Sequence, residues 1–451
     1  MASKAVAPDR LSPLRITWSG LSSRPILFGI SLLAAIVVVG LFVRMAAEFR
    51  YGIGDFDAYY SASMAARHGE SMYQQAIAWR DANWANNSPI GIRPVGGQPY
   101  PYPPALAIAI LPLTFLPVNI SIFVWFTIVF LSVIGSAYIL TGLLLPLRGL
   151  QRVTATLGAS ALMMLFQPVR ASFTSAQVDG LLLLLLCLSL AAFARRRDGR
   201  AGFWLALAAS VKLPLGLVVL LFLWKRAYRG VAVVAVVSAL LLFAPIVVFG
   251  PGMLREFIDV SIYYASPGYG TDPTNQALYG LWLRLFTVNP YTIPVIVAPL
   301  LPTVLKFLGA AAVLLVLVLT ITRSRALPIQ QLALEYGLVI AGALLISPLS
   351  EDIHFTQLLI PLFAATATLA LAWPRGRSAL ILGIAVAGAY LYLCIPSLRT
   401  LHMASYSFYQ APLQLPGILL TGVHTYGLIA AAVVTLLIVQ WHRGVLRARQ
   451  P

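Results

Sequence analysis

Two carboxylates and two tyrosines stand together directly after the first long apolar run of the chain. The sequence there reads Asp55-Phe56-Asp57-Ala58-Tyr59-Tyr60, and only 14 of the 451 residues are Asp or Glu. A carboxylate near a membrane surface is costly to desolvate, so acids in such places tend to be functional. A shielded carboxylate can also accept a proton from a hydroxyl group. Asp55 is therefore the first candidate for acid–base chemistry; the alternative is that both acids are simply solvated in a loop.

Further unusual polar residues stand at the ends of later apolar runs. Lys212 separates two short apolar stretches, where it either reaches a lipid headgroup, pairs with an acid such as Asp179, or neutralises a phosphate. His354 is one of five histidines and lies close to two acids. The full set is Gln177, Asp179, Lys212, Asn275, Gln276, Glu351, Asp352 and His354.

Metal and cofactor chemistry is weakly indicated. Glu351, Asp352 and His354 are of types that can bind a divalent cation, but their spacing is not diagnostic. The sequence has no glycine-rich nucleotide loop, Walker motif, nucleophile elbow or zinc-protease motif. We expect no metal and no cofactor. An enzyme of this kind would most simply take an already activated, lipid-borne substrate from the bilayer.

The composition predicts an all-α, polytopic membrane protein. Hydrophobic residues make up 60% of the chain, charged residues 10%, and the mean hydropathy is +0.86. Cys187 and Cys394 lie within apolar runs and indicate neither a disulfide nor a metal cluster. Apolar runs near the length of a membrane-spanning helix are expected at 26–45, 119–144, 153–167, 176–194, 229–249, 303–322, 332–348, 355–373, 378–395 and 423–441.

The net charge of +17 indicates orientation in a membrane and not nucleic-acid binding. Basic clusters recur between apolar runs, as at 195–200, 225–229 and 443–449. Most of the 31 Lys and Arg residues fall on one side if these clusters and the N-terminus are cytoplasmic. We therefore expect a multi-pass protein of the plasma membrane with both termini in the cytoplasm.

Two segments leave the number of crossings open. Residues 201–224 form either two short spans or a re-entrant hairpin with Lys212 at its tip, and 104–117 reads as a re-entrant or tilted helix. With these, roughly 12 crossings make one domain over residues 1–451. The outer segment 46–118 should carry amphipathic helices, because residues 55–68 have a plausible helical face. All the unusual polar residues then converge on the extracytoplasmic face.

Several segments, in order, resemble glycosyltransferase family 87, whose members include polyprenyl-phosphate-mannose-dependent mannosyltransferases of the GT-C fold. Each motif is weak alone, and six in sequence are fairly specific. The matching segments are Asp55 to Ala62, Tyr102-Pro103-Pro104 through Leu113, Ala176-Gln177-Val178-Asp179, Lys212-Leu213-Pro214, Asn275-Gln276, and Ser347 to His354.

The resemblance implies a GT-C membrane bundle that transfers a hexose, most simply mannose, from a polyprenyl phosphate to a lipid or glycan acceptor. Asp55 would be the general base, and positive charge near the departing phosphate would come from Lys212, with Arg93 or Arg284 as further candidates. The partners would be the polyprenyl-phosphate sugar donor, the acceptor and the bilayer. The residues expected to bind substrate are Asp57, Tyr59, Tyr60, Gln177, Asp179, Lys212, Asn275, Gln276, Glu351, Asp352 and His354.

The sequence departs from the family pattern at several positions. Ala176 replaces a glycine, Asp179 an asparagine, and Glu351 and Ile353 replace an aromatic residue and a histidine. Two rival functions remain open on the residues alone. A secondary transporter or lipid flippase could use Asp55, Asp179 and Lys212 to bind an ion or substrate, and a different GT-C transferase or a ligase of a lipid-linked polymer would have similar spans.

Overall fold

The computed structural model describes residues 24–49, 54–85, 99–372, 377–396 and 413–448, and these are predominantly α-helical. No β-strand occurs in these ranges, although isolated bridges join Asn275 to Glu351 and Thr292 to Leu413. The predicted all-α, polytopic fold class is confirmed.

Seven helices in the described ranges are long and apolar enough to cross a membrane. They are α1 (Arg24–Glu48), α5 (Val118–Leu144), α11 (Tyr228–Phe249), α15 (Leu301–Thr320), α16 (Ile329–Ile346), the 3₁₀ helix η3 (Asp352–Leu358) continued by α17 (Leu359–Ala372), and α21 (Val423–Arg447). Helices α1, α11 and α15 bury little of their surface inside the protein, while α16 is largely buried. This difference is expected if the first three face lipid and α16 lies at the centre of the bundle.

Shorter helices complete the bundle. The apolar ones are α4 (Pro104–Ile110) with η1 (Leu111–Phe115), α8 (Asp179–Ala194), η2 (Leu213–Val218) with α10 (Val219–Trp224), and α18 (Arg377–Leu393). They are joined by α6 (Gly149–Leu165), α7 (Gln167–Thr174) and α9 (Asp198–Ala209). Pro112 in η1 coincides with the change from α-helix to 3₁₀ helix, because proline cannot donate the backbone hydrogen bond that an α-helix needs.

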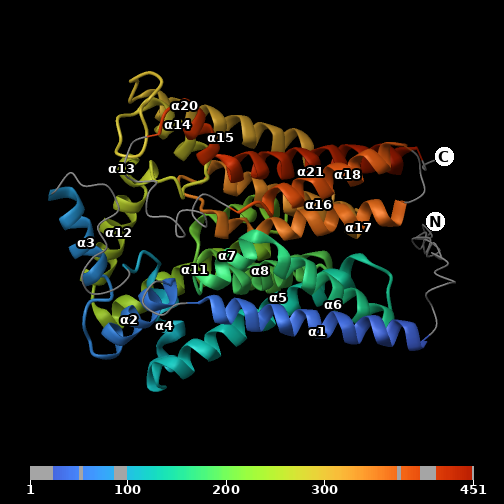
Figure 1. The fold of residues 1–451 in the computed structure, drawn as a ribbon, viewed down its shortest axis with the longest axis horizontal. Coiled ribbons are helices and arrows are strands. Elements are labelled where there is room, and N and C mark those ends of the chain that lie inside the picture. The colour runs from blue at the N-terminus through green and yellow to red at the C-terminus, as the bar shows by residue number, and fades with distance from the viewer. Residues whose placement is uncertain (1–23, 50–53, 86–98, 373–376, 397–412, 449–451) are drawn as a thin grey trace, which may run out of the picture.

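One end of the bundle carries the remaining short helices. They are α2 (Asp55–Arg67), α3 (Gln74–Ala85), α12 (Gly252–Tyr264), α13 (Pro267–Gly270), α14 (Leu278–Phe286) and α20 (Leu415–Thr421). Figure 1 shows α2, α3, α12 and α13 together at the left, while α1 begins and α21 ends at the right. The helix predicted over 55–68 is confirmed as α2. Helices α12, α13 and α14 were not predicted, because they lie between the expected apolar runs 229–249 and 303–322.

The residues 198–225 form a hairpin that returns to the end where it began. At its first residue, Asp198 forms an ion pair with Arg325 (2.8 Å between Oδ2 and Nη1). At its last, the Lys225 ammonium donates to the carbonyl oxygens of Thr322 (2.8 Å) and Ser324 (2.9 Å). Both ends therefore meet the connection between α15 and α16, and Lys212 lies at the turn between α9 and η2.

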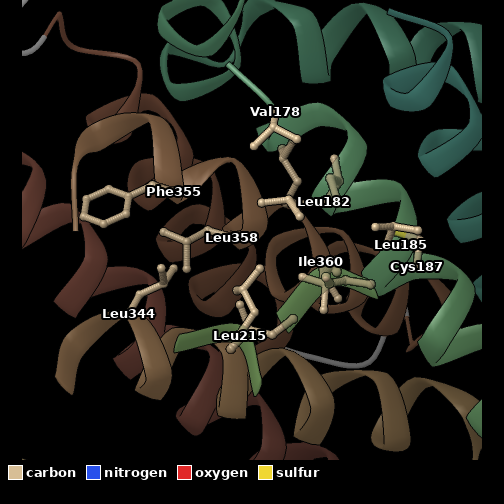
Figure 2. Close-up of a cluster of buried hydrophobic side chains, with 14 of the residues drawn as sticks. Val178, Leu182, Leu185, Cys187, Leu215, Leu344, Phe355, Leu358 and Ile360 are labelled. Atoms are coloured by element: carbon tan, nitrogen blue, oxygen red, sulfur yellow. The ribbon is translucent and has the colours of Figure 1, made fainter. Parts of the chain in front are cut away.

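The core beneath this turn is apolar and continuous. Figure 2 shows Val178 and Leu182, at the start of α8, near Leu215 of η2 and Leu358 of η3, all in a buried hydrophobic cluster. Gly180 permits the close approach of α8 to α5, because a Cβ there would lie 2.7 Å from a methyl group of Val129. These buried contacts fix the start of α8 against the hairpin turn and the late 3₁₀ helix.

Candidate active site

Asp55 is the first residue of α2, and its position is set by the turn before α8. Its backbone N–H donates to the carbonyl oxygen of Ser175 at 2.7 Å. Gly54 precedes it in an extended conformation, and a Cβ there would meet both the Phe49 ring and the Ser175 carbonyl. A carboxylate in the first turn of a helix is stabilised in its ionised form by the helix dipole. Asp55 is half-buried and Asp57 buried, so the shielded acid predicted for this segment is found at Asp57 and partly at Asp55.

Gln177 connects α2 to the Tyr-Pro-Pro segment. Its Oε1 accepts a hydrogen bond from the Tyr59 hydroxyl at 2.7 Å and from the Tyr102 hydroxyl at 3.2 Å. The carbonyl of the neighbouring Ala176 accepts from the Trp125 indole N–H at 2.9 Å. Tyr60, by contrast, directs its hydroxyl to the Leu116 carbonyl at 3.4 Å. The structure thus brings Tyr59 and Gln177 together and places Tyr60 at the packing contact between α2 and η1.

Both tyrosines next to Gln177 stay protonated and can act as donors. Burial raises the pKa of the Tyr59 phenol well above its usual value, and the negative charges of Asp55 and Asp179 raise it further. Burial also raises the pKa of Tyr102, with Tyr59, Asp55 and Asp179 adding to the effect. The charges of Asp55 and Asp179 therefore both act on this tyrosine pair.

Lys212 and Asp179 form a shielded ion pair. The Lys212 ammonium lies 2.7 Å from Asp179 Oδ2, and the two side chains are 10% and 0% exposed. The second oxygen, Oδ1, accepts from the amide of Gln357 at 3.1 Å. Of the three explanations left open for Lys212, pairing with Asp179 is the state that the structure has. The ammonium has three N–H groups, and one of them is directed to Asp179.

Asn275 and Gln276 fasten three loops to one another. Asn275 Nδ2 donates to the carbonyls of Gly270 (3.0 Å) and Pro348 (3.1 Å). Gln276 Nε2 donates to the Thr421 carbonyl (2.7 Å), while its Oε1 accepts from the backbone N–H groups of His424 and Thr425 (both 3.2 Å). Since these amide groups bind backbone atoms, the geometry gives both residues a positioning role for the loops around the site.

Glu351 and His354 begin the late 3₁₀ helix with reciprocal caps. The Glu351 backbone N–H donates to His354 Nδ1 (3.3 Å), and the Glu351 side chain accepts from the His354 backbone. Asp352 is 1% exposed, and its Oδ2 lies 3.9 Å from Nδ1 of His424, which sequence reasoning missed. Among the described residues, no group of three or more His, Cys, Asp and Glu side chains is arranged to hold a metal ion.

Asp55 links these clusters. Burial raises the pKa of the Tyr264 phenol on α12, and the charges of Asp55 and Glu351 both raise it further. The charge of Asp55 therefore acts on the phenols of Tyr59 and Tyr102 and also on that of Tyr264. Together with the Asp179–Lys212 pair, this assembly brings a candidate base, a candidate cation and several donors to the same end of the bundle.

Other basic candidates are less suited to a ligand. Arg284 is fully buried, and its Nη1 donates to the carbonyls of Asp272 (2.9 Å) and Asn275 (3.0 Å). Arg93 lies outside the described residues. Tyr102 and Gln357 were missing from the predicted set, although the Tyr-Pro-Pro motif already pointed to the first of them.

The fold and the shielded polar cluster define a membrane-embedded protein with a candidate site at one end of its helices. A sequence profile of glycosyltransferase family 87 matches residues 100–348, more than half of the chain. The chain therefore belongs to glycosyltransferase family 87 and is an enzyme of that class. The matched stretch contains Gln177 and Lys212 but not Asp55, Glu351 or Asp352. A comparison with curated proteins found no match.

Proposed function

We propose that this enzyme transfers a hexose, most simply mannose, from a polyprenyl phosphate to a lipid or glycan acceptor on the extracytoplasmic face of the plasma membrane. The observation that best supports this proposal is the hydrogen bond from Asp55 N to Ser175 O. It ties the candidate base to the turn before Asp179, and Asp179 forms the ion pair with Lys212. A base and a cation on one rigid assembly are what a displacement at a sugar–phosphate bond requires.

The proposed reaction is a single in-line displacement with inversion, in a protein of GT-C type. The acceptor hydroxyl oxygen attacks the anomeric carbon, its proton passes to Asp55, and the bond from the anomeric carbon to the phosphate oxygen breaks. Polyprenyl phosphate leaves with the bonding electron pair. No covalent enzyme intermediate is needed, because the donor is already activated.

Lys212 has a defined part in this proposal. Its charge is balanced by Asp179 in the structure, so the ammonium is held at the hairpin turn without an uncompensated charge. The N–H groups that are not directed to Asp179 would donate to the phosphate, and the hydrogen bond from Gln357 would keep the Asp179 carboxylate in place. Asp57, Tyr59, Glu351 and His354 would surround the sugar and the acceptor.

The orientation is supported by the distribution of charge. The ends of the hairpin at Asp198 and Lys225 meet the basic connection near Arg325. Lys225 also forms an ion pair with Glu335, which pairs with Arg443 near the end of α21. If this basic end is cytoplasmic, the Asp55 assembly lies on the extracytoplasmic side. Both termini then lie in the cytoplasm.

The test is transfer by the purified protein in lipid nanodiscs. Radiolabelled polyprenyl-phosphate mannose and polyprenyl-phosphate glucose would each be supplied with a panel of lipid and glycolipid acceptors. We expect label in one acceptor class and release of polyprenyl phosphate in equal amount. Absence of transfer from every polyprenyl-phosphate sugar, with transfer from a nucleotide sugar instead, would overturn the proposed donor.

A further inference from the structure

Four aromatic rings from three short helices pack together at the end of the molecule that carries Asp55. They belong to Trp79 of α3, Tyr263 and Tyr264 of α12, and Tyr269 of α13. The ring centroids of Tyr264 and Tyr269 are 4.4 Å apart, and Trp79 stacks on Tyr264 at 6.0 Å with an interplanar angle of 28°. Figure 1 shows these three helices close together at the left of the bundle. The four rings contact one another directly, unlike aromatic residues that are spread singly along a membrane–water interface.

Two rings of the cluster are buried and two are partly exposed. Trp79 and Tyr263 are buried, whereas Tyr264 and Tyr269 are half-buried. Helix α12 is also fastened to the chain before α3, because the Ser71 hydroxyl donates to Glu256 at 2.6 Å and the Phe257 ring packs on Tyr73 at 6.0 Å. Tyr264 is therefore held in one orientation before any ligand arrives, which reduces the entropy lost on binding.

The partly exposed tyrosines lie on the same side of the site as Glu351. Gly270, the neighbour of Tyr269, accepts a hydrogen bond from Asn275 Nδ2 at 3.0 Å, and Asn275 pairs with Glu351 in an isolated bridge. The charges of Asp55 and Glu351 also raise the pKa of the Tyr264 hydroxyl. An aromatic face is electron-rich and packs well against the weakly positive C–H groups on one face of a pyranose ring. Carboxylates accept hydrogen bonds from hydroxyl groups at the edge of such a ring. Two negative charges also disfavour an anionic ligand at this point.

We propose that Tyr264 and Tyr269, held in place by Trp79 and Tyr263, form the stacking surface for a neutral pyranose of the acceptor, so that the acceptor of this enzyme ends in a sugar. This inference rests on the proposed transfer reaction. The stacked sugar places one hydroxyl at Asp55, its proton passes to that carboxylate, and the oxygen forms the new bond to the anomeric carbon of the donor as the bond to phosphate breaks. A phosphate in the acceptor lies away from this surface.

The first test compares acceptors and variants in the transfer assay. A glycolipid with a terminal hexose is compared with the same lipid ending in a primary alcohol, using wild type, Tyr264→Leu, Tyr264→Phe and the exposed control Tyr228→Leu. We expect transfer to the sugar-terminated acceptor alone. Tyr264→Leu should raise the acceptor KM about tenfold, which corresponds to ~1.4 kcal/mol, with the donor KM unchanged. Tyr264→Phe keeps the aromatic ring and should retain most of the acceptor affinity that Tyr264→Leu loses, while the control Tyr228→Leu should behave as wild type.

A second test needs no turnover. Binding of methyl α-mannopyranoside and methyl β-glucopyranoside to the enzyme in nanodiscs is followed by saturation-transfer NMR, with Tyr264→Leu and, should that variant not fold, Tyr269→Leu. A signal in wild type that is lost in the variant supports the stacking surface, even if the proposed donor proves wrong. Sugar binding or an acceptor KM that does not depend on either tyrosine overturns the inference while leaving the transferase proposal standing.

Discussion

At the scale of single residues, variants of the Asp179–Lys212 ion pair test its effect on stability separately from its effect on transfer. Lys212→Met leaves the Asp179 charge buried without its cation, and breaking such a pair costs about 3–5 kcal/mol. The double variant Lys212→Met/Asp179→Leu removes both charges and should recover most of the lost thermal stability, measured as the unfolding midpoint in nanodiscs. Transfer activity should stay low in both. Recovery of activity in the double variant would remove Lys212 from the phosphate site.

Ala176 offers a second test, because it replaces the glycine of the family pattern with a strained residue. Its φ is +50°, in the left-handed region where a Cβ is costly. Ala176→Gly should therefore raise the free energy of unfolding by up to about 1 kcal/mol, after the greater freedom of glycine in the unfolded chain is deducted. The control Ala171→Gly lies within α7 and should lower stability. A lower unfolding midpoint for Ala176→Gly than for wild type would show that the backbone at Ala176 is not strained.

The residue types in the sequence indicated the candidate site residues but not the side chains that they contact. Asp55, Gln177, Asp179 and Lys212 stood out because polar groups at the ends of apolar runs are expensive. The partners of these groups depend on contacts between segments far apart in the chain, such as Gln357 with Asp179. His424 lies early in α21, and nothing in the sequence around it indicates its contact with Asp352.

At the scale of elements, the hairpin 198–225 depends on one very close helix contact. A Cβ on Gly202 of α9 would collide with the carbonyl oxygen of Gly230 on α11. Gly202→Ala should separate the two helices, lower the free energy of unfolding by about 1–3 kcal/mol, and displace Lys212 from Asp179. The matched control is Gly158→Ala in α6, where nothing lies within 4 Å of the added Cβ.

The measurements for this contact are thermal unfolding and donor KM. Gly202→Ala should lower the unfolding midpoint and raise the KM for the polyprenyl-phosphate sugar, while Gly158→Ala should leave the KM unchanged and keep or slightly raise stability. Equal effects of the two substitutions would show that the packing of α9 on α11 does not position the hairpin.

Long apolar runs allowed most spanning helices to be predicted, because the bilayer sets their length and composition. Helices α5, α16 and α21 match the expected runs closely. Hydropathy did not predict α7 and α12, because these helices are short and mix polar with apolar residues. Helices of this kind are stabilised mainly by tertiary packing, which a single sequence does not display.

At the scale of the whole molecule, the orientation predicts opposite labelling of the two ends. In a background where Cys187 and Cys394 are replaced by alanine, Arg200→Cys at the basic end and Ala265→Cys beside the aromatic cluster both provide exposed thiols. A membrane-impermeant maleimide added to intact cells should label Ala265→Cys alone. Both should be labelled once the membrane is made permeable. Labelling of Arg200→Cys in intact cells would reverse the proposed topology.

In the proposed reaction of the whole molecule, Asp55 acts as the base of the sugar transfer and Asp57 does not. The direct measurement is kcat for transfer from polyprenyl-phosphate mannose to a glycolipid acceptor, for wild type, Asp55→Asn and Asp57→Asn in nanodiscs. We predict that Asp55→Asn lowers kcat by about 10²–10⁴-fold with the donor KM nearly unchanged, and that Asp57→Asn loses much less. A kcat for Asp55→Asn equal to that of wild type would contradict the account.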